Sequence, residues 1–190
     1  MYLRKKMNKS NLKKILVLTI FSFGVVYLFN FSGVFIYNET NSLPIGYYIV
    51  DKDISLIDKG DIIRICPGED NQAIQLGIER GYLTRTNQSN CFIVSLLKVV
   101  EAKEGDFIEC RDNDVLINNK SYKKQLRDNK NRELSSCNLK RKLNKDEFFV
   151  MTQKHNSFDS RYFGVVTKNE IMSKAKPFIT WSNEDRKSVV

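Results

Sequence analysis

The stretch Phe92–Val100 reads FIVSLLKVV and holds one charged residue, Lys98, in a predominantly apolar run. Short runs rich in β-branched and aromatic residues, bounded by turn residues, are typical of β-strands. Similar runs, separated by Gly, Asp and Asn, recur at Tyr47–Val50, Ile62–Cys66, Phe107–Cys110, Val115–Asn118 and Phe148–Thr152. The pattern predicts a mainly β fold, with Asn118-Asn119 as a hairpin turn and one short helix at Asn71–Arg80.

The length of 190 residues fits one domain with a hydrophobic core. Residues 119–146 are polar and rich in Lys and Arg, and they interrupt the series of strand-like runs. We expect this stretch to form a small subdomain inserted into the main β domain, which would occupy residues 38–190.

An uncharged apolar segment, Ile15–Tyr37, precedes the strand-like part of the chain. Its 23 residues, at about 1.5 Å each in a helix, can cross a bilayer core of roughly 30 Å. A cleaved signal peptide would have a shorter apolar region followed by a small-x-small site, and no such site follows Tyr37. The segment therefore predicts a single transmembrane anchor and membrane lipid as a partner.

The net charge of +9 is concentrated at the N-terminus, where residues 1–14 hold six Lys or Arg and no acid. The positive-inside rule predicts that this basic tail is cytoplasmic and that residues 38–190 lie outside the membrane, in the bacterial periplasm or its equivalent. The rest of the chain after residue 14 carries a net charge of only +3. Because a nucleic-acid-binding domain would carry its positive charge on the folded part, the charge pattern argues against a nucleic-acid partner.

The four cysteines, Cys66, Cys91, Cys110 and Cys137, contain no CxxC pair, and His155 is the one histidine. This spacing disfavours a zinc site, so no metal is expected, and it leaves disulfides and buried thiols both open. A Ser-His-Asp triad would need His155 and an aspartate such as Asp159 to converge from positions four residues apart, which is an awkward geometry.

Two side chains are candidates for nucleophilic chemistry. Ser42 lies in a turn before a strand and is followed by Pro44 and Gly46, so its hydroxyl could face a substrate. Lys98 lies in the apolar run, and burial would lower its pKa and make its neutral amine a general base. Taken singly, Ser42 also fits an ordinary loop serine and Lys98 a solvent-facing strand lysine, while Asp159 and Arg161 fit a structural ion pair.

Taken in order, three stretches resemble the motifs of bacterial type I signal peptidases, and more closely those of the TraF-type conjugative-transfer peptidases. Ser42-Leu43-Pro44-Ile45-Gly46 resembles the Ser-x-Pro-x-Gly box that follows a membrane helix. Leu96-Leu97-Lys98 with Gly105-Asp106 resembles the lysine box, and Ser157–Gly164 is similar to the C-terminal box. Two shorter stretches are more weakly similar to the TraF branch. They are Lys59–Ile63, which precedes Cys66-Pro67, and Glu79–Leu83, which precedes Cys91.

The resemblance implies a β-rich catalytic domain with an inserted subdomain and no cofactor. It implies Ser42 as nucleophile, Lys98 as general base, Thr40 with the Ser42 backbone N–H as the oxyanion hole, and Ser157 as the residue that orients the lysine. Asp159 and Arg161 match a supporting pair. We expect Cys66–Cys91 as a disulfide, and Cys110–Cys137 as a second one.

The implied function is a membrane-anchored serine endopeptidase that cleaves signal or pro-segments of exported polypeptide precursors, with pilin-like conjugation proteins as substrates. Some TraF-type enzymes are associated with cyclising transpeptidation, and the sequence leaves open whether this chain only cleaves or also cyclises. A general type I signal peptidase and a non-catalytic subunit of a secretion or conjugation apparatus remain alternatives. Because Ser42 lies five residues beyond Tyr37, those residues would hold it within about 18 Å of the anchor.

Overall fold

The computed structural model describes residues 8–31, 33–87 and 90–181, and its strands form two antiparallel sheets. The larger sheet has seven strands in the spatial order β1-β2-β11-β3-β4-β9-β10. These are β1 (Phe35–Asn38), β2 (Ile45–Asp51), β3 (Ile62–Ile65), β4 (Leu96–Ala102), β9 (Glu147–Met151), β10 (Val166–Thr167) and β11 (Ile171–Trp181). The predicted mainly β fold is confirmed.

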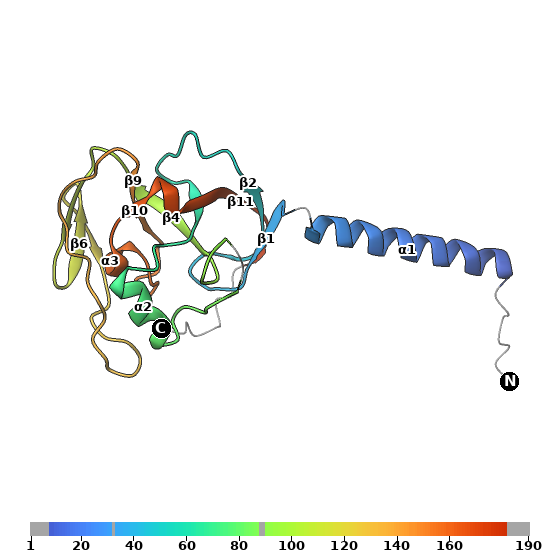
Figure 1. Cartoon of the computed structure of the whole chain (residues 1–190), viewed down its shortest axis with the longest axis horizontal. Helices are drawn as coiled ribbons and strands as arrows, with labels where there is room; N and C mark the ends of the chain where they lie inside the picture. The colour runs from blue at the N-terminus through green and yellow to red at the C-terminus, as the bar shows by residue number, and fades with distance from the viewer. Residues whose placement is uncertain (1–7, 32, 88–89, 182–190) are drawn as a thin grey trace.

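The smaller sheet has four strands in the order β7-β6-β5-β8 and lies at the end of the molecule remote from α1 (Figure 1). Its strands are β5 (Phe107–Cys110), β6 (Asp114–Ile117), β7 (Lys120–Lys123) and β8 (Lys140–Lys142). The described helices are α1 (Lys9–Phe31), α2 (Gln72–Glu79), α3 (Ser160–Phe163) and the 3₁₀ turn η1 (Lys168–Glu170). The subdomain predicted at 119–146 contributes β7 and β8, but its boundary stays a prediction because β5 and β6 precede it.

The turn prediction at Asn118-Asn119 is confirmed, since both residues have positive φ, 48° and 68°, and join β6 to β7. The predicted helix at Asn71–Arg80 is also confirmed, as α2 with Asn71 as its N-cap. The strand predicted at Phe92–Val100 instead begins at Leu96. Phe92 and Ile93 belong to the preceding loop, where Ile93 forms an isolated bridge with Arg85.

The strand β11 was missed by the sequence patterns although it has 11 residues. Its lysines and Pro177 are residues that are uncommon in strands, so its composition does not indicate one. Its pairing with β2 shifts register between Pro177 and Ile179. Because β11 pairs with both β2 and β3, it connects the N-terminal hairpin to the rest of the sheet.

The predicted apolar segment Ile15–Tyr37 is not one continuous helix, and its C-terminal boundary was wrong. The helix α1 ends at Phe31, Gly33 has φ +62°, and β1 then pairs along its whole length with β2. Aromatic and β-branched residues suit a strand as well as a membrane helix, so hydropathy alone did not separate them. Ser42 therefore lies eleven residues after the end of α1 rather than five.

The helix α1 projects away from the globular part, from the side where β1 lies (Figure 1). None of the described helices reaches the combination of length and hydropathy expected for crossing a bilayer. Residues 1–7 of the predicted basic tail lie outside the described residues.

Two hydrophobic clusters lie on the two faces of the larger sheet. The main cluster packs α2, α3 and Phe158 against β3, β4 and β9, with Ile63, Val100 and Val150 fully buried. A second cluster joins Phe149 and Met151 of β9 to Ile108 and Val115 of the smaller sheet. The position of Lys98 in β4 is therefore beside the main core.

Candidate active site

The loop between β1 and β2 carries Ser42, and Asn38 organises it. The Asn38 side-chain nitrogen donates to the carbonyl oxygens of Thr40 at 3.0 Å, Leu43 at 3.2 Å and Pro44 at 3.1 Å. The Pro44 carbonyl also accepts from the hydroxyl of Tyr48 at 2.7 Å. A buried amide that binds three carbonyls fixes the loop backbone, and with it the position of Ser42.

Gly46, the second residue of β2, packs against β11 just after the loop that carries Ser42. A Cβ at this position would lie 2.2 Å from the carbonyl oxygen of Ile179 in β11, and the residue has φ +142°. Only glycine allows the two backbones this approach. The glycine therefore allows β2 to pair closely with β11 just beyond the loop that carries Ser42.

Thr40 and Ser42 form a hydrogen-bonded pair, with 3.1 Å between the two hydroxyl oxygens. The Thr40 hydroxyl donates to Asn38 Oδ1 at 2.9 Å, and a hydroxyl has one proton. Ser42 is therefore the donor in the Thr40 pair. To act as a nucleophile, Ser42 must redirect this proton to a base.

Lys98 lies in the middle of β4 and is only 4 % exposed. It lies on the same face of the sheet as Val100, which belongs to the main core, and it is paired with Ile63 on β3. Its Nζ donates to Ser157 Oγ at 2.7 Å. The lysine is thus buried, and its hydrogen-bond partner among the described residues is a neutral hydroxyl rather than a carboxylate.

Burial lowers the pKa of Lys98 from 10.5 to about 8. Desolvation penalises the ammonium form and is the main cause; the charge of Asp159 opposes it, and that of Arg161 adds to it. Near neutral pH, a substantial minority of Lys98 is therefore the neutral amine that a general base requires.

Ser157 is held in place by the buried pair Asp159–Arg161, which follows it in the chain. Arg161 donates to the Asp159 carboxylate through Nε at 2.8 Å and Nη2 at 2.6 Å. It also donates to the carbonyl oxygens of Lys154 at 2.6 Å and Lys123 at 3.0 Å. The pair therefore joins the Ser157 loop to the smaller sheet.

Phe158 fixes the same loop from the core side. Its ring stacks on Tyr162 with 5.6 Å between centroids and contacts Tyr82 at 5.7 Å. Gly77 of α2 approaches it so closely that a Cβ there would lie 3.1 Å from the ring. Packing on one side of the chain and an ion pair on the other leave Ser157 little freedom.

The structure thus arranges the predicted site residues as two hydrogen-bonded pairs, Thr40–Ser42 and Lys98–Ser157. No hydrogen bond joins the pairs among the residues that the structure describes. Leu43, next to Ser42, packs against a cluster that includes Leu97, next to Lys98. His155 is exposed and Asp159 is engaged by Arg161, so a triad through His155 has no support.

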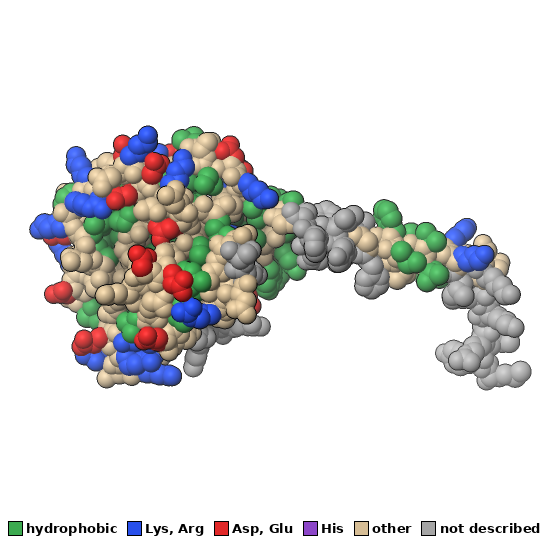
Figure 2. Space-filling view, in the orientation of Figure 1, with side chains coloured by type: hydrophobic (Ala, Val, Ile, Leu, Met, Phe, Trp, Pro, Cys, Tyr) green, Lys and Arg blue, Asp and Glu red, His purple; other side chains and the backbone are tan. Residues whose placement is uncertain are grey.

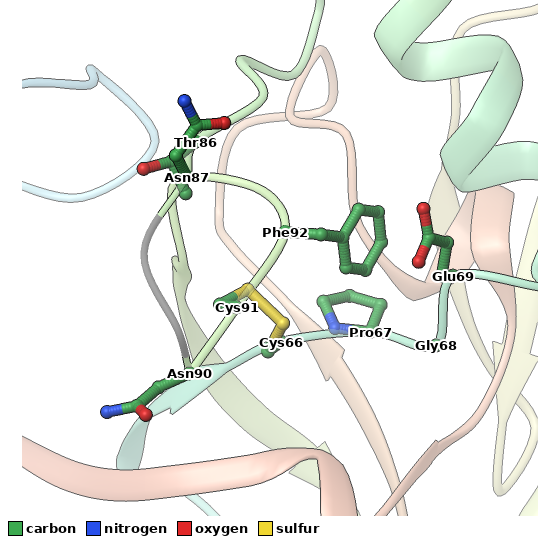
Figure 3. Close-up of a pocket in the computed structure, with 9 residues that line it drawn as sticks. All are labelled: Cys66, Pro67, Gly68, Glu69, Thr86, Asn87, Asn90, Cys91 and Phe92. Carbon is green, nitrogen blue, oxygen red and sulfur yellow. A yellow bond between two sulfur atoms is a disulfide. The ribbon is translucent and has the colours of Figure 1, made fainter.

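Both expected disulfides are formed, Cys66–Cys91 and Cys110–Cys137. Cys66–Cys91 links the chain just after β3 to the loop that leads into β4, and it lies in a surface pocket (Figure 3). That pocket is lined by none of the residues of the two pairs. We therefore assign the disulfide to holding the approach to β4, not to the chemistry.

Two polar residues near the site were not singled out by the sequence. Asn38 ends an apolar segment and looks like an ordinary turn residue, so nothing in its pattern indicates its three carbonyl contacts. Thr152 ends the predicted strand run and follows β9, and its buried hydroxyl has no hydrogen-bond partner among the described residues. Both roles depend on contacts between residues that sequence spacing does not reveal.

Comparison with known proteins gives these pairs a family context. The model of the family described as signal peptidase, peptidase S26, matches residues 9–181. The chain belongs to this family. Two Escherichia coli proteins named plasmid transfer protein TraF are similar to this S26 peptidase, at 27% and 28% identity over 154 residues, covering 76% of this chain and 82% of each relative. The predicted resemblance to TraF-type S26 peptidases is confirmed.

A solved signal peptidase I from Enterococcus faecalis V583 is also similar to the S26 peptidase. The identity is 18%, the TM-score is 0.35, and the match covers 64% of this chain and 97% of that one. Family membership makes the protein a serine peptidase of the signal-peptidase type, which acts on polypeptides. Among its described residues, no group of three or more His, Cys, Asp or Glu is arranged to hold a metal ion.

Proposed function

We propose that this S26 peptidase is a membrane-anchored endopeptidase that uses Ser42 as nucleophile and Lys98 as general base. Ser42 Oγ attacks the scissile carbonyl carbon while neutral Lys98 takes its proton. The Ser42 N–H stabilises the oxyanion, and the Thr40 hydroxyl joins it when its proton turns from Asn38 Oδ1 to the oxyanion. The intermediate expels the amine, which receives the proton from Lys98, and water then hydrolyses the ester on Ser42.

The observation that carries this proposal is the environment of Lys98. A buried lysine paired with a carboxylate would stay charged and could not accept a proton. Lys98 instead donates to the hydroxyl of Ser157 at 2.7 Å, and its pKa is lowered to about 8. Catalytic hydrogen bonds often tighten only when substrate binds, so we expect the hydrogen bond between Ser42 and this amine to form in the substrate complex.

We further propose that α1 anchors the enzyme, with residues 1–14 in the cytoplasm and residues 38–190 in the periplasm or its equivalent. The basic residues before and at the start of α1 favour this orientation. Hydrophobic side chains also gather where the globular part meets α1 (Figure 2). On β1 and β11, Tyr37, Phe178 and Trp181 are 51%, 54% and 44% exposed, and aromatic residues of this kind favour the membrane interface.

The substrates that fit this arrangement are exported precursors cut near the membrane surface. The similarity to plasmid transfer proteins named TraF favours pilin-like conjugation proteins over a general secretory role. Cyclising transpeptidation would follow if the precursor's own amine, rather than water, attacks the ester on Ser42. A non-catalytic subunit is the alternative from a different class, and the buried Lys98–Ser157 pair argues against it.

The Ser42→Ala variant is expected to leave the precursor uncleaved, because no other hydroxyl occupies the nucleophile position. The experiment co-expresses full-length enzyme and a candidate pilin-like precursor, and it measures product by mass spectrometry and N-terminal sequencing. Thr40→Ser, which keeps the hydroxyl, is the matched control and should cleave. Processing by Ser42→Ala at the wild-type rate would rule out the proposed nucleophile. A product lighter than the linear one by one water would identify cyclisation.

The cleavage rate is expected to rise with pH up to about 8 and then level off. Below the pKa of Lys98, the neutral fraction falls about tenfold for each pH unit, and the rate follows it. The measurement is kcat/KM of the full chain in detergent against a peptide without titratable groups, from about pH 5.5 to about pH 9.5. A rate independent of pH across this range would contradict Lys98 as the base.

A further inference from the structure

Thr152 carries a buried hydroxyl that the mechanism described so far does not use. The residue is 6% exposed, and its Oγ1 has no hydrogen-bond partner in the part of the chain that the structure describes. Burying a hydroxyl without a partner costs free energy, and such groups are uncommon in folded proteins. Its backbone N–H, by contrast, donates to Asp159 Oδ2 at 3.3 Å.

Thr152 directly follows the strand that pairs with the Lys98 strand. The antiparallel pairing of β4 with β9 joins Val100 to Val150 and ends at Val99 with Met151. Continuing this register by one position would bring Thr152 opposite Lys98. Opposed residues in antiparallel strands project to the same face, with Cβ atoms about 5 Å apart. Val100 is two residues from Lys98, and Val150 is two residues from Thr152. Both valines belong to the main core on that face.

The protonated Lys98 has one donor for which the contacts described so far give no acceptor. A neutral lysine has two N–H groups, but the ammonium formed on taking the Ser42 proton has three donors. One donates to Ser157 Oγ, and one must face Ser42 and the leaving amine. The Asp159 carboxylate already accepts from Arg161 and from the Thr152 N–H, so it is not the acceptor for the third N–H of the Lys98 ammonium.

We propose that Thr152 is a positioning residue for Lys98, and that its hydroxyl accepts a hydrogen bond, directly or through one water, from the ammonium that forms during the reaction. This inference rests on the proposed function of Lys98 as the base. Thr152 follows β9, which flanks β4 on the side opposite β3. On the β3 side, the Ile63 side chain opposite Lys98 offers no acceptor. It thereby holds the amine in line with Ser42 while the proton is on it.

The charged groups that act on Lys98 are Asp159 and Arg161, both from the segment after β9. Asp159 favours the ammonium and Arg161 disfavours it, and substitution of Thr152 leaves both in place. Losing an acceptor for the ammonium lowers the pKa of the lysine. The rising limb of the pH–rate profile should therefore move to lower pH when the hydroxyl is removed.

The test replaces Thr152 by Val, which has the same shape without the hydroxyl, and by Ser, which keeps the hydroxyl. Thr152→Val is expected to lower kcat about tenfold with little change in KM, since the lost bond forms with the charged lysine. Its rising limb should shift to lower pH, while Thr152→Ser should restore both values. The melting temperature of Thr152→Val should not fall, because an unpartnered buried hydroxyl is exchanged for a methyl group.

Ser173 provides a matched control, because its hydroxyl is also buried and without a partner. It lies on β11 opposite Arg64, outside the two site pairs, and Ser173→Ala should leave kcat and the pH profile unchanged. A Thr152→Val enzyme with wild-type kcat and pH profile would overturn the inference, as would a rate loss that comes with a lower melting temperature and no pH shift. Ser42→Ala, measured in parallel, tests the proposed function separately, since its full activity would refute that function whatever Thr152 does.

Discussion

Lys98→Met is expected to abolish cleavage and, at the same time, to stabilise the fold. Methionine fills a similar volume but has no basic nitrogen, and removing the partner that activates a serine nucleophile typically costs on the order of 10⁴-fold or more in kcat. The matched control is Lys124→Met. Lys124 is also buried and its pKa is also lowered by desolvation, but it lies near the smaller sheet and contacts Ser136. It should retain activity.

The stabilisation follows from the lowered pKa of Lys98. At pH 7 both the folded and the unfolded chain bind a proton there, and the shift from 10.5 to about 8 means that the folded state holds it at a cost. That cost is on the order of 3 kcal/mol. Lys98→Met removes the cost, but it also leaves Ser157 without its donor, which offsets part of the gain in stability. A net gain of about 2 kcal/mol in the free energy of unfolding is expected at pH 7.

The pH dependence of this gain has a definite sign. Between pH 8 and pH 10.5 the unfolded chain binds a proton at Lys98 that the folded chain does not, so the stability of the wild type rises with pH. The difference between the variant and the wild type should therefore shrink through this window. Denaturant unfolding of both full-length chains in detergent measures it. A variant less stable than the wild type at pH 7 would contradict a buried lysine of lowered pKa.

Arg161→Met is expected to cause the largest loss of stability among the site variants. It would leave the Asp159 carboxylate, whose side chain is fully buried, without its two guanidinium donors, and it would also free the carbonyls of Lys154 and Lys123. Removing one partner of a buried ion pair typically costs about 3–5 kcal/mol, which for a chain of this size lowers the melting temperature by roughly 10 °C.

The control for this experiment is the exposed ion pair Arg127–Glu133, whose side chains are 50% and 79% exposed. Arg127→Met should change the free energy of unfolding by less than about 1 kcal/mol, because exposed pairs are well solvated. The double variant Asp159→Leu with Arg161→Met should be more stable than Arg161→Met alone, since no unpaired charge remains buried. Equal melting temperatures for Arg161→Met and Arg127→Met would show that the buried pair does not support the Ser157 loop.

Local sequence patterns identified most strands and the helix α2, because the residues that favour each of these elements are close together in the chain. The run around Lys98 has strand composition, and Asn118-Asn119 allows the positive φ values of a tight hairpin turn. The same patterns failed where one composition fits two structures. Phe35–Asn38 reads as the end of an apolar helix but pairs with β2, and β11 was hidden by its lysines and Pro177.

The sequence by itself determined the mainly β class, the family resemblance and the identity of Ser42, Lys98 and Ser157 as candidates, since motif order and spacing are properties of the chain. Only the tertiary structure decided that Lys98 is buried and bonded to Ser157, 59 residues away. It also decided that Asn38 shapes the loop that carries Ser42, and that the Thr152 hydroxyl is buried without a hydrogen-bond partner among the described residues. Desolvation and hydrogen bonding depend on which strands become neighbours, and no single stretch of sequence contains that information.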